Sequence, residues 1–307
     1  MMSVRKHVVL VDEHGGPLAG MAPRLKELGF QILLVSDPNL LFETIRDVRK
    51  YSLVVINGAV IGKAACAFVT SIKELHPELP VLFTSEAGAP VEFHAQKPDV
   101  VFSGPVFADT INEQAIRLLR ESLYPNSIVD ALKTIAAGTL ASFGRFTVSE
   151  DPFLKASRTL LLSFNAVIPL TGSHHMAGHL LVSAREEVLR SSYSALFNSA
   201  PVSIEVLEDL VGEMCNMMSG GIKAFVEKKG TSLLIGVPTF IRGQQVSFRR
   251  GIATPSLTVG ATCQTTRSSS PSAEDLFVEL YFERVDPGIF DAKAGNALLE
   301  SDEITFL

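Results

Sequence analysis

Asp209, Glu213 and Asn216 have polar side chains whose spacing could bring them together on one face of a helix. On a helix that turns by about 100° per residue, Glu213 lies about 40° and Asn216 about −20° from Asp209. An amide donates and accepts hydrogen bonds, so Asn216 could orient a water molecule, and Glu213 one turn away could pair with a cation. The spacing therefore predicts one polar helix face that carries two carboxylates and an amide.

The residues around this motif predict an amphipathic helix over Ile204–Lys228, seated on a sheet by its apolar side. The apolar side is expected to contain Leu207, Leu210, Met214, Met217, Met218 and Phe225. Three small residues, Gly212, Ser219 and Gly220, are expected on the polar side. Small neighbours would let the surface of another protein approach the helix closely.

The elements around the helix predict an α+β domain over residues 127–286. Further helices are expected at Ser127–Leu140 and Arg185–Phe197, and a hairpin at Asn165–Ser183. The remaining expected strands are Ser232–Val237, Ser256–Ala261 and Asp275–Phe282. An acidic C-terminal tail is expected over residues 287–307.

The long helix resembles the signature helix of the CheC/CheX/FliY phosphatases, which dephosphorylate chemotaxis receivers. The family signature is an Asp or Ser, then a Glu, an Asn and a distant Pro. These positions correspond to Asp209, Glu213, Asn216 and, in LLIGVPTFIRG, Pro238. The segment IPLTGSHHMAGHLLVSAREEVLRS also resembles the hairpin and following helix of that fold. The resemblance implies a CheX-like domain with a long signature helix on an antiparallel sheet.

The same resemblance implies a role for each signature residue. Asn216 would position the attacking water, and Glu213 would pair with the conserved lysine of an incoming receiver. Asp209 and Pro238 would support them, Asp209 by orienting Lys223 or the docking surface. Mg²⁺ would arrive bound to the receiver, so the chain is expected to need no metal or cofactor of its own. A homodimer formed through the sheets is also implied.

Some family members carry a second signature on the first helix of the domain. Here Asp130 could take the first position, but Thr134 and Ala137 stand where the Glu and Asn would be. One active face per chain is therefore expected.

Residues 1–123 alternate short apolar runs with helical patterns, which predicts βα units. Strands are expected at His7–Val11, Gln31–Val35, Leu53–Ile56, Pro80–Thr84 and Val100–Phe102. Helices are expected at Met21–Leu28, Leu40–Lys50, Ala64–Leu75 and Ile111–Leu123, with a weaker pattern at Pro90–Lys97. The pattern predicts an α/β doubly wound five-stranded parallel sheet, with its functional end at the carboxyl ends of the strands. Residues 124–126 are the expected linker, because proline disfavours helix at the residue before it.

This half resembles a CheY-like receiver domain over about residues 4–123. Receivers carry an acidic pair after the first strand, here Asp12-Glu13, and a hydroxyl residue after the fourth, here Thr84. Such acids would hold Mg²⁺ through carboxylate oxygens.

Two demanding receiver positions do not match. Asn57 stands where receivers carry the aspartate that accepts phosphate, and Gly104 stands where they carry a lysine. An amide is not a carboxylate nucleophile, so no acyl phosphate forms here without prior deamidation. We therefore expect a phosphate-inert pseudo-receiver that docks partners or holds the second domain in place.

Composition excludes several other classes of protein. The 307 residues are 47% hydrophobic, which is enough for two separate cores. The net charge is −6 and no block of Lys or Arg occurs, so nucleic acid is disfavoured as a partner. No stretch approaches the roughly 20 apolar residues that cross a bilayer. Three widely spaced cysteines without a CxxC pair indicate reduced thiols, so a soluble, cytoplasmic protein is expected.

Two other groups of residues are expected to be structural. His174, His175 and His179 lie in or after a Gly-flanked turn, which favours a polar turn over a metal site. Cys215 adjoins the signature residues but points to the helix flank, and we expect it to pack rather than act as a nucleophile.

The leading hypothesis is an aspartyl-phosphate phosphatase, a hydrolase that acts on a separate phosphorylated response regulator in chemotaxis or other two-component signalling. The alternative is a non-catalytic adaptor that binds receivers without turnover. Phosphate loss from a phosphorylated receiver, with and without Asn216→Ala, would separate the two.

Overall fold

The computed structural model describes residues 7–45, 50–85, 93, 96–103, 108–155, 162–173, 176–198, 202–242, 255–264 and 275–284. The chain divides into two compact units. The first comprises Met1–Tyr124 together with Phe153–Thr159 and Gln245–Leu257. The second comprises Pro125–Pro152, Leu160–Gln244 and Thr258–Leu307.

The first unit contains a parallel sheet with the strand order β2-β1-β3-β4-β5. Its strands are β1 (His7–Val11), β2 (Gln31–Val35), β3 (Tyr51–Asn57), β4 (Val81–Ser85) and β5 (Val100–Ser103). Its helices are η1 (Pro17–Met21), α1 (Ala22–Glu27), α2 (Asn39–Thr44), α3 (Gly58–Ile61), η3 (Gly62–Ala64), α4 (Ala65–Leu75) and α5 (Ala108–Leu123). This strand order is that of flavodoxin-like doubly wound sheets, so the predicted fold class of the first half is confirmed.

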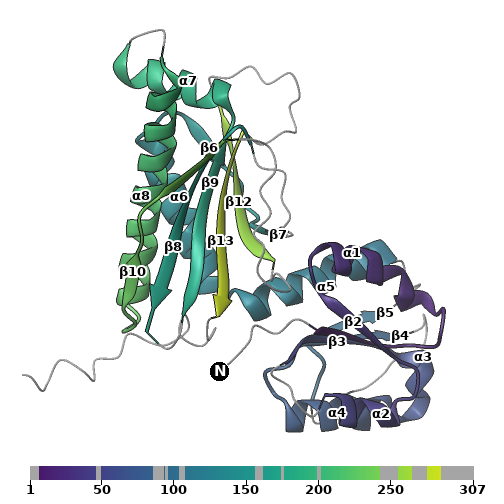
Figure 1. Ribbon diagram of the computed structural model, residues 1–307. Helices are drawn as coiled ribbons and strands as arrows, with labels where there is room; N and C mark the ends of the chain where they lie inside the picture. Colours follow the sequence, from purple (N-terminus) through teal and green to yellow (C-terminus); the bar gives the residue numbers. More distant parts are fainter. Residues whose placement is uncertain are drawn as a thin grey trace, which may run out of the picture. The chain divides into compact units, whose positions relative to one another are not determined.

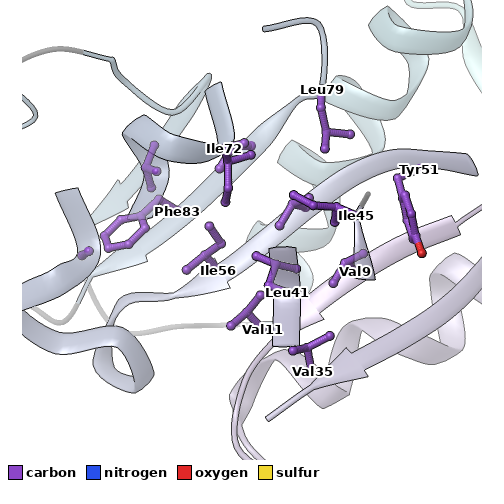
Figure 2. Packing of buried hydrophobic residues seen from close by; sticks show 14 residues of the cluster. Val9, Val11, Val35, Leu41, Ile45, Tyr51, Ile56, Ile72, Leu79 and Phe83 are labelled. Atoms are coloured by element: carbon purple, nitrogen blue, oxygen red, sulfur yellow. The ribbon is translucent and has the colours of Figure 1, made fainter. Parts of the chain in front are cut away.

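Helices cover both faces of this sheet, and the inner strands β1 and β3 are therefore buried on both sides (Figure 1). Val9 and Val11 point into one core cluster, where they lie with Leu41 of α2 and Ile72 of α4 (Figure 2). Their neighbours in β1, including Leu10, point to the opposite face and are equally buried. The carboxyl ends of β1, β3 and β4 meet at one edge, which places the receiver-type residues there.

The helices of the first unit differ from the predictions in their details. The predicted helix Met21–Leu28 is α1, preceded by the short turn η1, and α3 and η3 were not predicted. The predicted helix Leu40–Lys50 is α2, which ends at Thr44, and residues 46–49 lie outside the described part of the chain. Most of the weaker pattern Pro90–Lys97 also lies outside it.

The second unit is built on a sheet with the strand order β10-β8-β9-β13-β12-β6, in which β11 also pairs with β8. Its strands are β6 (Phe146–Val148), β8 (Phe164–Gly172), β9 (Ala177–Ala184), β10 (Leu233–Ile235), β11 (Thr239–Arg242), β12 (Ser256–Cys263) and β13 (Leu276–Arg284). The short strand β7 (Phe153–Lys155) belongs to a segment assigned to the first unit. Its helices are α6 (Asn126–Ala141), α7 (Glu186–Phe197) and α8 (Ile204–Glu227). The predicted antiparallel sheet with a long helix is confirmed, and α6 and α8 lie beside it (Figure 1).

The predicted strand Ser232–Val237 is shorter in the structure and continues after a break. β10 pairs with Leu170–Gly172 of β8, and β11 pairs with Phe164–Val167 of the same strand. Between them Gly236 passes Pro169 so closely that an added Cβ would lie 2.5 Å from the proline ring. Proline offers no N–H to a ladder, which explains an interruption at this point. The short strands β6, β7 and β11 were not predicted.

Candidate functional site on the long helix

The helix α8 is held on the sheet by one continuous buried side. Val211, Met214, Met218 and Ile222 are fully buried, and the helix contacts β8 and β9. Burial of these side chains is the main reason that a helix of this length is rigid in position.

Asp209, Glu213, Asn216 and Gly220 are all exposed on the opposite side of α8. Glu213 and Asn216 are three residues apart, which places their Cβ atoms about 5–6 Å from each other on a helix surface. Within the part of the chain that the structure describes, neither side chain has a hydrogen-bond or ion-pair partner. The predicted exposure of this face is confirmed, while the catalytic roles of its residues remain predictions.

Three predicted positions around the helix were wrong. Met217, expected on the buried side, is 41% exposed, and Gly212 and Ser219, expected on the open side, are buried. Met217 lies about 80° from Asp209, at the border of the apolar side. On the other border, Gly212 and Ser219 lie about −60° and −80° from Asp209, and neighbouring elements cover them.

Phe240 of β11 covers the helix at Gly212. A Cβ at Gly212 would lie 2.5 Å and 2.6 Å from two atoms of the Phe240 ring, so only glycine permits this contact. Phe240 is 42% exposed and Val237, just before β11, is 81% exposed. Phe240 therefore forms a partly exposed apolar border beside the polar face. The isolated glycine within a helical pattern was the sequence signal that could have indicated a close neighbour.

The carboxylates of α8 differ in their partners. Arg242 Nε donates to Glu208 Oε1, and this hydrogen bond lowers the pKa of the Glu208 carboxyl. Lys223 Nζ lies 3.7 Å from Glu227 Oε1, so the expectation that Asp209 orients Lys223 was wrong. Lys223 is fourteen residues along the helix from Asp209, a rise of about 21 Å. Unlike Glu208 and Glu227, Glu213 has no ion-pair partner among the described residues. Its carboxylate is therefore available to a cation from another molecule.

Pro238 lies in the break between β10 and β11, where it is half-buried. Its missing N–H cannot extend the ladder to β8, which resumes at Thr239. The break is followed by β11, whose Phe240 lies against α8 at Gly212. The supporting role of Pro238 remains a prediction.

The other titratable residues considered from the sequence are structural in their surroundings. Burial raises the pKa of the Cys215 thiol to about 12, so it is not a thiolate at neutral pH. Its Sγ lies 3.4 Å from the Ala166 carbonyl oxygen, within the helix–sheet contact. His179 stacks on Tyr281, with ring centroids 4.7 Å apart, and burial lowers its pKa to about 4. His174 and His175 lie outside the described residues, among which no cluster of metal ligands occurs.

On α6, the positions equivalent to a second signature are exposed but lack the chemistry. Asp130, Thr134 and Ala137 all face outward, and the Thr134 hydroxyl donates to the Asp130 carbonyl oxygen at 2.8 Å. A hydroxyl and a methyl group do not replace a carboxylate and an amide, which is consistent with one active face.

The receiver-type residues of the first unit meet only in part. Asn57 Nδ2 donates to Asp12 Oδ1 at 2.8 Å, which joins the ends of β1 and β3. Thr84 is paired in register with Asn57, but its hydroxyl donates to the Ile56 carbonyl oxygen at 3.3 Å. Glu13 is exposed, and Gly104 lies outside the described residues.

The sequence of the second unit matches a known family. Residues 164–261 match the profile of the family described as Chemotaxis phosphatase CheX, a stretch that contains α8 and Pro238. Together with the sheet of the first unit, this match identifies a receiver-like unit joined to a CheX-like domain. No curated protein matches the chain. No helix among the described residues is long and apolar enough to cross a membrane.

Several solved structures are similar in part. A chemotactic CheC-like protein from Shewanella oneidensis MR-1 is 21% identical over 52% of this chain and 97% of its own, with a TM-score of 0.41. A CheX–CheY–BeF3–Mg²⁺ complex from Borrelia burgdorferi gives 17% identity over 51% of this chain and 97% of the matched chain, with a TM-score of 0.40. A response regulator receiver domain protein from Clostridium thermocellum is 13% identical over 38% of this chain and 94% of its own, with a TM-score of 0.31.

Proposed function

We propose that the second unit hydrolyses the aspartyl phosphate of a separate CheY-like response regulator that docks on α8. One observation carries the proposal: Glu213 and Asn216 are exposed and unpaired among the described residues, three positions apart on a rigid helix. Both lie in the stretch that matches the CheX profile.

The chemistry requires positioning more than covalent participation. Water attacks the phosphorus in line, the receiver's aspartate leaves as a carboxylate, and inorganic phosphate and a proton are released. The Asn216 amide can hold that water because it both donates and accepts hydrogen bonds. The Glu213 carboxylate pairs with a lysine on the receiver, which fixes how the two proteins meet. Mg²⁺ belongs to the receiver in this scheme, and Asp209 extends the polar docking face.

The test is phosphate release from CheY-like receivers phosphorylated with acetyl phosphate, in the presence of the purified full chain. Asn216→Ala and Glu213→Gln should each lower the stimulated rate by about 10²–10³, the usual effect of removing one well-placed polar group. Asp130→Ala is the matched control, since it removes an exposed side chain on a neighbouring helix of the same unit. Circular dichroism should show that all three variants remain folded.

The two hypotheses make different predictions in this assay. Stimulated release that persists unchanged in Asn216→Ala would rule out the proposed role of α8. Receivers that bind the wild-type chain without any loss of phosphate would instead identify a non-catalytic adaptor.

We also propose a homodimer of this unit, which the CheX resemblance implies. Among the described strands, β10 lies at one edge of the sheet, and Leu234 on it is 69% exposed. An exposed apolar edge strand is a ready surface for pairing with a second copy.

A further inference from the structure

The buried carboxylate of Asp12 is engaged by hydrogen-bond donors of its own unit. Oδ1 accepts from Asn57 Nδ2 at 2.8 Å and from the Glu13 amide at 2.9 Å. Oδ2 accepts from the Leu18 amide at 2.7 Å. Asp12 is fully buried, so these three donors replace water around its charge.

The side chain of Asn57 is fixed at both ends of its amide. Its Oδ1 accepts from the Ala59 amide at 3.1 Å, as the cap of α3, while its Nδ2 donates to Asp12. With 8% exposure it has little freedom to rotate. The N–H group therefore points at the carboxylate, and the amide oxygen points away from it.

These residues do not fit the Mg²⁺ that a receiver fold implies. Mg²⁺ needs oxygen ligands about 2.0–2.1 Å away in octahedral geometry and usually keeps several waters. Here an N–H donor lies against Asp12 Oδ1, on the side of β3. On another side Gly16 is so close that an added Cβ would lie 2.4 Å from both Asp12 oxygens. The carboxylate thus has neither a second oxygen ligand facing it at Asn57 nor space for a hydrated ion beside Gly16.

We infer that the Asn57 amide takes the place of the cation beside Asp12, so the first unit has a receiver-like fold that binds neither metal nor phosphate at this site. This inference does not rest on the phosphatase proposal, because it concerns only residues of the first unit. It has a consequence for that proposal, however. A chain without a phosphate-accepting aspartate at residue 57 offers α8 no substrate there, so any hydrolysis at an equivalent site takes place on another protein.

The test uses hydrogen–deuterium exchange of the full chain, followed at the amides of Leu18 and Ala59, in EDTA and with Mg²⁺ or Mn²⁺. The wild-type chain should exchange at the same rate in all three conditions. Asn57→Asp puts a second carboxylate 2.8 Å from Asp12, at the position of the donor. In EDTA its Leu18 amide should exchange roughly 100-fold faster, because two buried anions repel. A cation at ten times its Kd should then slow the exchange about tenfold.

Asn39→Asp is the matched control. Asn39 Nδ2 also donates to an aspartate, Asp37 Oδ1 at 2.9 Å, but this pair is exposed. The same one-atom change there should leave the Leu18 amide unaffected by EDTA or cation. If Asn57→Asp fails to fold, Asn57→Ala serves instead and should speed exchange at Leu18 roughly tenfold through loss of one donor.

Three results would overturn the inference. The first is slower exchange of the wild-type Leu18 amide in Mg²⁺ or Mn²⁺. The second is an Asn57→Asp chain whose Leu18 amide exchanges at the same rate with and without the cation. The third is an Asn57→Ala chain whose Leu18 amide exchanges at the wild-type rate.

Discussion

Two adjacent glycines of α8 provide a sharp test of how the helix is packed. Nothing lies within 4 Å of a Cβ added at Gly220, whereas at Gly221 it would lie 2.7 Å and 3.0 Å from two carbons of Ile135 on α6. In a helix interior, glycine is less favourable than alanine by about 0.8–1.0 kcal/mol. Gly220→Ala should therefore stabilise the second unit by about 1 kcal/mol. Gly221→Ala gains the same propensity, but overpacking costs roughly 1–3 kcal/mol, so its net effect is zero or destabilising.

The assay is urea unfolding of the full chain, monitored by far-UV circular dichroism. Because both substitutions are in the same helix, the difference between their free energies of unfolding isolates the contact with Ile135, and about 1–3 kcal/mol is expected. For a unit of this size, the gain at Gly220 corresponds to a melting temperature about 2–4 °C higher. Gly220→Ala that destabilises, or Gly221→Ala that stabilises equally, would refute the packing argument.

Gly220→Ala also probes the docking face. Gly220 is exposed one turn beyond Asn216, so under the proposed function its added methyl group lies where a receiver approaches. We expect the more stable variant to show a KM about tenfold higher for the phosphorylated receiver, the equivalent of about 1.4 kcal/mol. An unchanged KM would place the receiver away from this turn of the helix.

Two further predictions concern pH and assembly. His179 has a folded pKa of about 4 against its usual 6.5, so the unfolded chain binds the extra proton between these values. The free energy of unfolding is therefore unaffected by this group above pH 6.5. It decreases as the pH falls towards 4, by at most about 3 kcal/mol. His179→Phe keeps a ring against Tyr281 and should lose this part of the acid sensitivity. Urea unfolding at pH 7 and pH 4.5 measures it, and a variant whose free energy of unfolding decreases as much as that of the wild type would contradict the assignment. Leu234→Asp should raise the dimer dissociation constant by roughly 10²–10⁴, because each copy buries one Leu side chain in a symmetric contact. The constant is measured by sedimentation equilibrium. A value equal to that of the wild type would show that β10 is not part of the interface.

The sequence by itself determined the elements whose pattern is local. The helix predicted over residues 204–228 is α8, Ile204–Glu227, because an apolar repeat at helical spacing has one way to bury itself. The exposed position of Glu213 and Asn216 followed from the same angle of about 100° per residue. The five parallel strands were also predictable, since apolar runs between helical segments are typical of a sheet covered on both faces.

Tertiary structure decided what lies at the borders of these patterns. Whether Met217 or Gly212 is covered depends on neighbours far away in sequence, and Phe240 reaches Gly212 from a strand too short to give a periodic signal. In the same way, the sequence showed that Asn57 is no nucleophile, but only the fold brings its amide to Asp12 across 45 residues. The physical reason is common to these cases. Periodicity specifies which way a side chain points, whereas its contacts depend on which elements the chain later packs beside it.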